Sequence, residues 1–259
     1  MIELSIADGI AEVVLNAPHK LNALDAQAFT DLKNTVDEAA AGVAAGSVRA
    51  LLLRGEGRAF CAGRDLSEVA VDNDDALAFL EGKIVPAMRA IMDFPAPSFV
   101  AAQGASLGAG LGLLIAADVV YVAENAKIGS PFANLGMVLD SGGHWLFTER
   151  LGTHRTLDLI YTADLISGAE AVRSGLFSRA FPAESLLEET RNIVARVAKG
   201  PLNAFQDGKK LVTAIRDDRL GFWEALDIEN KVQAAIVSTE NYREGITAFQ
   251  EKRPPIFKN

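Results

Sequence analysis

The chain has 259 residues, 49% apolar and 23% charged, which is typical of a globular protein that buries a sizeable core. Its net charge of −9 argues against a surface built for nucleic acid, because such a surface needs clustered Lys and Arg. The single cysteine, Cys61, excludes an intrachain disulfide, and the N-terminus lacks the pattern of a signal peptide. We therefore expect a cytoplasmic protein.

The first half of the chain alternates between strand and helix patterns. Segments 2–6 and 10–15 predict a hairpin around Asp8-Gly9, and Asp25 predicts the N-cap of a helix over 26–44. Further strands are predicted at 48–53, 98–102 and 119–123, and further helices at 76–92 and 107–117. Strands that alternate with helices predict a layered α/β core.

The segment from Phe94 to Ala117 carries no charge and has the length of a membrane span. It contains two prolines, Gln103 and four glycines, which favours a strand, a loop and a buried helix instead. After about Gly142 the strand signals nearly vanish. Helical patterns continue through 186–198, 202–215, 222–237 and 242–250. These patterns predict an α/β body over 1–195 and a helical part over 196–259.

Two glycine-rich segments follow predicted buried strands. The first is Arg58-Ala59-Phe60-Cys61-Ala62-Gly63-Arg64-Asp65-Leu66, and the second is Gln103-Gly104-Ala105-Ser106-Leu107-Gly108-Ala109-Gly110-Leu111-Gly112. Two such loops can direct two peptide N–H groups at one oxygen, which is what holding an enolate requires. One loop alone would be more typical of a tight turn. The two loops together favour a site that binds an oxyanion. Two further motifs support this interpretation, Asn22-Ala23-Leu24 upstream and Glu251-Lys252-Arg253-Pro254 downstream.

These segments resemble the crotonase (enoyl-CoA hydratase/isomerase) superfamily, and the resemblance covers nearly the whole chain. It implies an α/β fold in which a crotonase-like spiral of ββα turns over 1–195 binds acyl-CoA. It also implies a helical C-terminal region over 196–259 that forms the contacts of a homotrimer or a dimer of trimers. The substrate carries coenzyme A, so no separate cofactor or metal is expected, and neither nucleic acid nor a membrane is an expected partner.

The resemblance also implies which backbone groups hold the thioester oxygen. The first N–H donor would be Arg64, which follows Gly63, and the second would be Ala109, in the middle of a small triplet at a helix N-terminus. By the same resemblance, the residues that bind coenzyme A would be Lys20, Leu21, Ala23, Ala62, Asp65, Leu66, Phe249 and Lys252. For the two lysines, a solvated surface charge is the alternative.

Hydratases of the superfamily use two glutamates to place and activate one water. This chain has Gly112 at the first of these positions and Phe132, after Pro131, at the second. Neither side chain can carry a proton. We therefore predict a poor enoyl-CoA hydratase.

One carboxylate remains in a suitable place, at Asp140 before Ser141-Gly142-Gly143. Related dienoyl-CoA and 1,2-epoxyphenylacetyl-CoA isomerases carry a catalytic aspartate in this region. An aspartate in an apolar pocket has a raised pKa, which suits proton shuttling near neutral pH. The resemblance thus implies an acyl-CoA isomerase that shifts a double bond or rearranges a ring, with Asp140 as the proton shuttle. Capping of the following helix is the alternative role for Asp140.

Other activities stay open at this point. Asp140 could weakly activate water as in a hydratase, or serve a hydrolase or a dehalogenase, and a non-catalytic acyl-CoA binder is a further possibility. The dehalogenase branch also relies on a Trp shortly before the aspartate, and none occurs between Ile128 and Asp140. Cys61 has no activating His in a motif and indicates packing. The acyl pocket is expected to be lined by Phe132, Met137, Leu139 and His144, with residues 69–80 as one wall.

Overall fold

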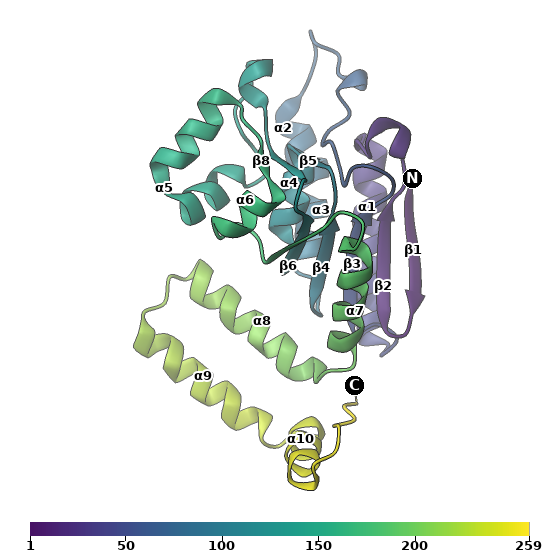
Figure 1. Cartoon of the computed structure of the whole chain (residues 1–259), viewed down its shortest axis with the longest axis vertical. Coiled ribbons are helices and arrows are strands. Elements are labelled where there is room, and N and C mark those ends of the chain that lie inside the picture. The colour runs from purple at the N-terminus through teal and green to yellow at the C-terminus, as the bar shows by residue number, and fades with distance from the viewer. Residues whose placement is uncertain (259) are drawn as a thin grey trace.

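The computed structural model describes residues 1–258 and contains two sheets, covered by helices and followed by an extended helical arm (Figure 1). The larger sheet has the strand order β1-β2-β3-β4-β6-β9, in which β1 and β2 are antiparallel and the other neighbours are parallel. Its strands are β1 (Ile2–Ala7), β2 (Ile10–Leu15), β3 (Ala50–Gly55), β4 (Ser98–Ala102), β6 (Val119–Ala123) and β9 (Arg179–Phe181). The smaller sheet has the order β5 (Ala105–Leu107), β7 (Lys127–Gly129) and β8 (Ile166–Ser167).

The predicted N-terminal hairpin and the helix after it are confirmed. Asp8 and Gly9 have φ of +52° and +76°, the left-handed pair that a two-residue hairpin turn requires. Helix α1 (Ala26–Ala44) begins where expected, and the carboxylate of Asp25 accepts a hydrogen bond of 2.8 Å from the N–H of Ala28. Strands β4 and β6 also have their predicted bounds, whereas β3 begins and ends two residues later than predicted.

Most of the remaining helices follow predicted helical segments, and one predicted helix is interrupted. The helix predicted over 76–92 consists of α2 (Ala76–Phe79), a π-helical segment (Leu80–Ile84) and α3 (Val85–Met92). The other helices are α4 (Ala109–Ala116), α5 (Gly143–Thr162), α6 (Gly168–Arg173), α7 (Leu186–Ala198), α8 (Leu202–Asp217), α9 (Phe222–Ile236) and α10 (Glu240–Glu251). Of these, α4 and α7 to α10 follow predicted helical segments, whereas α5 and α6 had no predicted bounds. Short 3-10 helices occupy Pro18–Lys20, Leu66–Glu68 and Phe132–Leu135.

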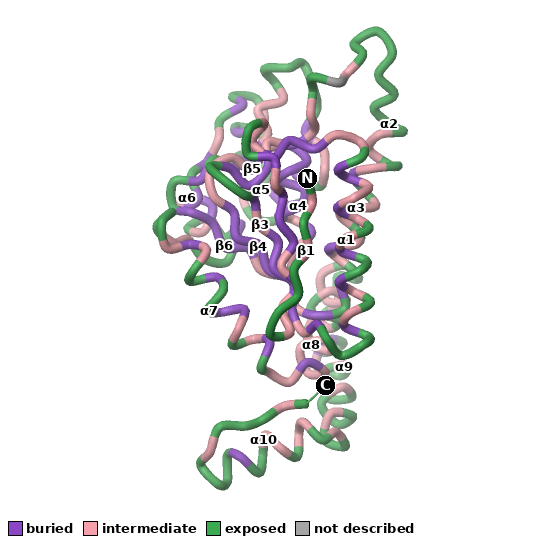
Figure 2. Tube along the Cα trace, turned by 90° about the vertical axis from the view of Figure 1, so that its right-hand side faces the viewer, coloured by how far each residue is buried: buried purple, intermediate pink, exposed green. Residues whose placement is uncertain are grey.

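The core lies between the larger sheet and the helices that pack against it. Strands β3 and β4 are buried almost throughout, while the helical arm is mostly exposed or intermediate (Figure 2). In the part of the chain that the structure describes, no helix is long and apolar enough to cross a bilayer. The uncharged segment 94–117 is divided among β4, β5 and α4, as predicted except for the short strand β5.

The C-terminal helices leave the body after α7. Helix α7 packs against the larger sheet, and Arg49 holds its end by donating to the carbonyl oxygens of Ala198 (2.5 Å) and Gly200 (2.6 Å). Helices α8, α9 and α10 extend away from this point (Figure 1). The predicted division after residue 195 therefore falls inside α7, three residues before the helix ends.

Candidate active site

A cavity of about 460 Å³ lies where the two glycine-rich loops meet. Its walls come from both loops, from the start of α2 and from the segment Pro131–Asp140. The predicted site residues that line it are Ala62, Arg64, Leu66, Ala109 and Asp140. The structure thus brings residues from three separate segments of the chain to one hollow.

In the first loop, the N–H of Arg64 points away from Leu24, the residue that pairs with it. Leu24 donates to the carbonyl of Gly63 (2.8 Å) and accepts from the N–H of Asp65 (2.9 Å), which forms a parallel bridge between Leu24 and Arg64. In such a bridge the N–H of the middle residue points to the opposite side. The N–H of Arg64, a cavity-lining residue, is therefore not used by Leu24.

The second loop places a helix N-terminus beside the first loop. Ala109 is the first residue of α4, and the first N–H groups of a helix have no partner within it. A Cβ on Gly63 would lie 2.7 Å from the carbonyl oxygen of Leu107 and 3.4 Å from the nitrogen of Ala109. Only glycine fits there, since Gly63 also has a φ of +97°. The N–H groups of Arg64 and Ala109 can thus serve one oxygen from two adjoining loops.

Asp140 lies half-buried in the cavity wall, on the loop before α5. Burial raises the pKa of its carboxyl group, while a hydrogen bond from Ser141 and the charges of Arg64 and His144 act in the opposite direction. The Ser141 hydroxyl donates to Oδ1 of Asp140 at 2.7 Å. A carboxyl group with this environment can exchange a proton with a substrate in the cavity.

The alternative role of Asp140 as a helix cap is wrong. The N-cap of α5 is Gly142, with a φ of +82° and no side-chain capping bond. Asp140 contributes only its backbone carbonyl, which accepts from the N–H of Gly143 at 2.9 Å. Its carboxylate is therefore left to the cavity and to Ser141.

Gly112 and Phe132 stand at the two positions where, by resemblance, hydratases carry glutamates. A Cβ on Gly112 would lie 2.7 Å from Cβ of Ser141 and 3.1 Å from Sδ of Met88, so the loop after Asp140 fills that space. Phe132 lines the cavity, and its ring lies 3.0 Å from where a Cβ on Gly108 would stand. Among the described residues that line the cavity, the carboxylates are those of Asp74 and Asp140.

The side chain of Arg64 crosses the cavity rim to the segment before α2. Its guanidinium donates to both carboxylate oxygens of Asp74, at 3.0 and 2.6 Å, and lies 3.9 Å from the centre of the Phe79 ring. The expected wall formed by residues 69–80 is thus present, with Asp74, Ala76 and Leu80 facing the cavity.

Most of the residues expected to bind coenzyme A lie beside the first loop. The carbonyl of Leu21 accepts from the N–H of Ala62 at 3.0 Å, so the segment Lys20–Ala23 runs next to Ala62 and Asp65. Lys20 is not a free cation, since its Nζ lies 2.9 Å from Asp65 and 3.3 Å from Asp25. Hydrogen bonds from Ser67 and Lys20 lower the pKa of Asp65 to about 2.

Phe249 and Lys252 are not part of this group within one chain. Both belong to the end of α10, at the opposite end of the molecule from α2 and β5 (Figure 1). Phe249 is 83% exposed. His144, expected in the acyl pocket, is exposed and does not belong to the cavity lining among the described residues. Its neighbour Trp145 lines a separate cavity of about 700 Å³ between α5 and α8.

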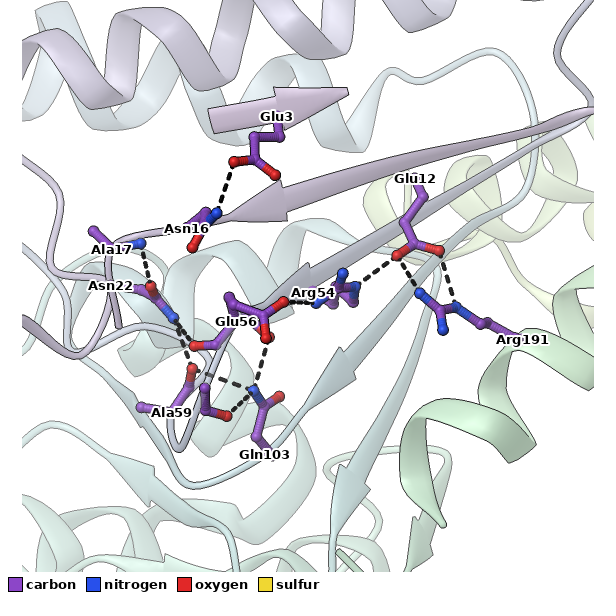
Figure 3. A network of polar contacts seen from close by, with 12 residues as sticks. Glu3, Glu12, Asn16, Ala17, Asn22, Arg54, Glu56, Ala59, Gln103 and Arg191 are labelled. Carbon is purple, nitrogen blue, oxygen red and sulfur yellow. Dashed lines mark hydrogen bonds and ion pairs between the residues drawn. The ribbon is translucent and has the colours of Figure 1, made fainter. Parts of the chain in front are cut away.

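Asn22 is a structural residue that the sequence pattern did not assign. Its side chain is fully buried and makes three hydrogen bonds, from the N–H of Ala17 (2.8 Å) and to the carbonyls of Glu56 (2.9 Å) and Ala59 (2.8 Å) (Figure 3). This amide ties the segment before α1 to the first glycine loop. The sequence pattern included Asn22 only as part of the motif Asn22-Ala23-Leu24, which assigned its side chain no structural role.

Cys61 is a packing residue, as predicted. Its thiol is fully buried and donates to the carbonyl of Asn22 at 3.2 Å, and burial raises its pKa to about 12. Such a thiol is not a nucleophile near neutral pH. Among the side chains that the structure describes, no three from His, Cys, Asp or Glu gather closely enough to hold a metal ion.

A family model described as enoyl-CoA hydratase/isomerase matches residues 5–259. The chain belongs to this family. A "Probable enoyl-CoA hydratase" of Rhodobacter capsulatus is 35% identical over 99% of this chain and 97% of its own length. The 1,2-epoxyphenylacetyl-CoA isomerase of Escherichia coli is 28% identical over 97% of this chain and 96% of its own length.

The fold of the family is also confirmed by comparison with a solved structure. The enoyl-CoA hydratase of Bacillus anthracis superposes with a TM-score of 0.90, at 28% identity, over 99% of this chain and 98% of that one. The predicted α/β crotonase fold with C-terminal helices is therefore correct. The chain is an acyl-CoA enzyme of a family that contains both hydratases and isomerases.

Proposed function

We propose that the protein is an acyl-CoA isomerase that shifts a double bond, or rearranges a ring, through an enolate, with Asp140 as the proton shuttle. This proposal is supported above all by the carboxylates that line the cavity and by how they are paired. Asp74 is paired with Arg64, which leaves Asp140 as the carboxylate without an ion pair among the described lining residues. The second carboxylate that would activate a water has no counterpart at Gly112 or Phe132.

The enolate would form between the two glycine loops. The thioester oxygen accepts from the N–H groups of Arg64 and Ala109, which stabilise the negative charge that develops on it. The dipole of α4 adds positive potential at the Ala109 end. These donors are backbone groups of packed loops, so they need little reorganisation when the charge appears.

Asp140 would carry the proton between two carbons of the acyl chain. As a carboxylate it takes a proton from one carbon, and the electron pair moves into the enolate. The protonated Asp140 then returns the proton to another carbon, and the thioester carbonyl re-forms. The cycle consumes no water and leaves Asp140 ionised as it began. The raised pKa of Asp140 favours both halves of this transfer.

Coenzyme A would run past the segment Lys20–Ala23 and the residues Ala62, Asp65 and Leu66. Helix α10, which carries Phe249 and ends at the C-cap Lys252, lies at the opposite end of the molecule from α2 (Figure 1), so these two residues would contact coenzyme A bound to a second copy. Their proposed role therefore requires the proposed homotrimer or dimer of trimers. Gel filtration with light scattering measures the assembly directly, and a monomer would remove these two residues from the site.

The test is mass spectrometry of acyl-CoAs after incubation in D₂O with a 3-enoyl-CoA and, separately, a 2-enoyl-CoA. We expect a shifted double bond and no added water, with deuterium uptake wherever the protonated Asp140 exchanges with solvent before it returns the proton. Asp140→Asn should reduce this turnover by at least about 100-fold, the usual contribution of a general acid–base group. Asp158→Asn, at an exposed position on α5, is the matched control and should leave turnover unchanged. Full activity in Asp140→Asn would refute the assignment.

A hydratase is the second candidate, favoured by the printed name of the relative at 35% identity. The same incubation distinguishes it, because hydration adds an oxygen and two hydrogen isotopes from the solvent to the product, whereas isomerisation adds no oxygen. Addition of water by the wild-type chain would mean that water is activated without the two glutamates. It would replace the isomerase as the proposed function.

A further inference from the structure

Arg64 has two carboxylates available to it at the cavity, and it pairs with one of them. Its guanidinium forms a bidentate pair with Asp74, while no ion pair joins it to Asp140 among the described residues. Arg64 is nevertheless near enough for its charge to favour the ionised form of Asp140. All three side chains line the same cavity. Whether Arg64 pairs with Asp74 or with Asp140 therefore affects the pKa of Asp140, the carboxylate proposed to move the proton.

We propose that Asp74 is a positioning residue, which occupies the Arg64 guanidinium and thereby leaves Asp140 free to exchange protons. This inference rests on the proposed function. Asp74 itself touches no reacting atom and acts only through Arg64.

The geometry around Arg64 supports this role. A planar guanidinium forms its strongest contacts in a bidentate pair with a carboxylate, and Asp74 satisfies that arrangement. The guanidinium also lies over the ring of Phe79, which in turn packs edge-on against the buried ring of Phe29 at 5.9 Å. Arg64 is thus held on the side of α2 by two contacts, one of them anchored in the core.

The groups around Asp140 leave Arg64 as the strongest competitor for it. His144 on α5 also acts electrostatically on Asp140, and its side chain is exposed. Met88 on α3 and Ile115 on α4, which lie against the loop that carries Asp140, are uncharged. Among the described residues that line the cavity, Asp140 is the carboxylate without an ion pair, so it is the partner left for a guanidinium released from Asp74. A pair between them would stabilise the carboxylate and weaken it as a base.

The decisive measurement is the titration of the Asp140 carboxyl carbon by ¹³C NMR in protein labelled at aspartate, with the resonance assigned from Asp140→Asn. We expect Asp74→Asn to lower the pKa of Asp140 by about 1–3 units, the usual effect of an adjacent arginine. Asp74→Glu retains the carboxylate and should retain the wild-type pKa. Asp72→Asn, at an exposed position on the same segment, is the matched control and should change nothing.

The double variant Arg64→Gln/Asp74→Asn separates this role from a merely structural one. With no guanidinium left to capture Asp140, its pKa should return to the wild-type value or rise above it. The backbone N–H of residue 64 is present in every variant. The acid limb of kcat/KM should move with the NMR value, downward in Asp74→Asn and back in the double variant.

If Asp74 only holds the cavity wall, Asp74→Asn would raise KM and leave the pKa of Asp140 unchanged. Adding Arg64→Gln would then restore neither the KM nor the pH profile. An unchanged Asp140 pKa in Asp74→Asn overturns the proposal. The NMR titration needs no substrate, so it remains readable if Asp140→Asn proves fully active. That result would refute the isomerase assignment, whereas an unchanged titration would refute only the role of Asp74.

Discussion

Gly112 on α4 lies directly against Ser141, so closely that a Cβ at residue 112 would stand 2.7 Å from Cβ of Ser141. By resemblance, residue 112 is where a hydratase carries its first catalytic glutamate. In this chain the loop that presents Asp140 occupies that space instead. The loss of one carboxylate and the placement of the other are therefore linked by packing.

Gly112→Ala should destabilise the fold. The added methyl group meets Ser141 and Met88, and overpacking of this kind costs about 1–3 kcal/mol of unfolding free energy. Gly82→Ala is the control, because no described atom lies within 4 Å of a Cβ there, and alanine in a helical segment should stabilise by about 0.5–1 kcal/mol. Urea titrations should show a lower midpoint for Gly112→Ala and a higher midpoint for Gly82→Ala than for the wild type. Equal midpoints would contradict the packing argument.

The buried, ionised carboxylate of Asp140 should lower the free energy of unfolding at neutral pH. Its folded-state pKa is raised, so the stability it contributes is fully present below its unfolded pKa and is lost as the pH rises through the folded pKa. Asp140→Asn has no charge to bury, and Asn can still accept from Ser141. Thermal unfolding should therefore show a higher Tm for the variant near pH 7, with the difference vanishing below about pH 4. A variant that is less stable at every pH would show that burial is not the dominant cause.

Ser141→Ala should make Asp140 a weaker acid. The hydroxyl donates to the carboxylate at 2.7 Å and stabilises the ionised form, so its removal raises the pKa of Asp140 further. The acid limb of kcat/KM for deuterium exchange should move to higher pH. A limb that stays in place would mean that water replaces the hydroxyl as the donor.

Asn22→Ala should unfold the chain more readily than any exposed substitution near it. The change leaves the N–H of Ala17 and the carbonyls of Glu56 and Ala59 without their side-chain partner, at a cost of about 3 kcal/mol. Asn16→Ala removes only an exposed bond to Glu3 and should cost less than about 0.5 kcal/mol (Figure 3). Urea unfolding of the pair measures the difference.

Cys61 should be unreactive until the protein unfolds. A thiol that is fully buried, with a pKa of about 12, offers almost no thiolate near neutral pH. A chromogenic disulfide reagent should therefore label the native protein very slowly and label it fully in urea. Rapid native labelling would show that the first glycine loop opens.

The elements that could be predicted are those whose patterns are long enough to repeat. The hairpin, α1, β4, β6 and the C-terminal helices carry several turns or pleats each, so their apolar spacing is visible. Strands β5, β7, β8 and β9 have two or three residues each, too few to show a period. The π-helical segment 80–84 adds a residue to the helical turn, which spacing alone does not show.

The candidate site divides in the same way. The amino-acid sequence by itself determined which side chains are present, including the absence of both glutamates and the presence of Asp140 after Leu139. Only the tertiary structure decided which charges meet. Lys20 pairs with Asp65, 45 residues away, and Arg64 pairs with Asp74 and not with Asp140. Helix α10, which carries Phe249, lies at the opposite end of the molecule from α2 (Figure 1). Ion pairs depend on distance and exposure in space, and neither is written into local spacing.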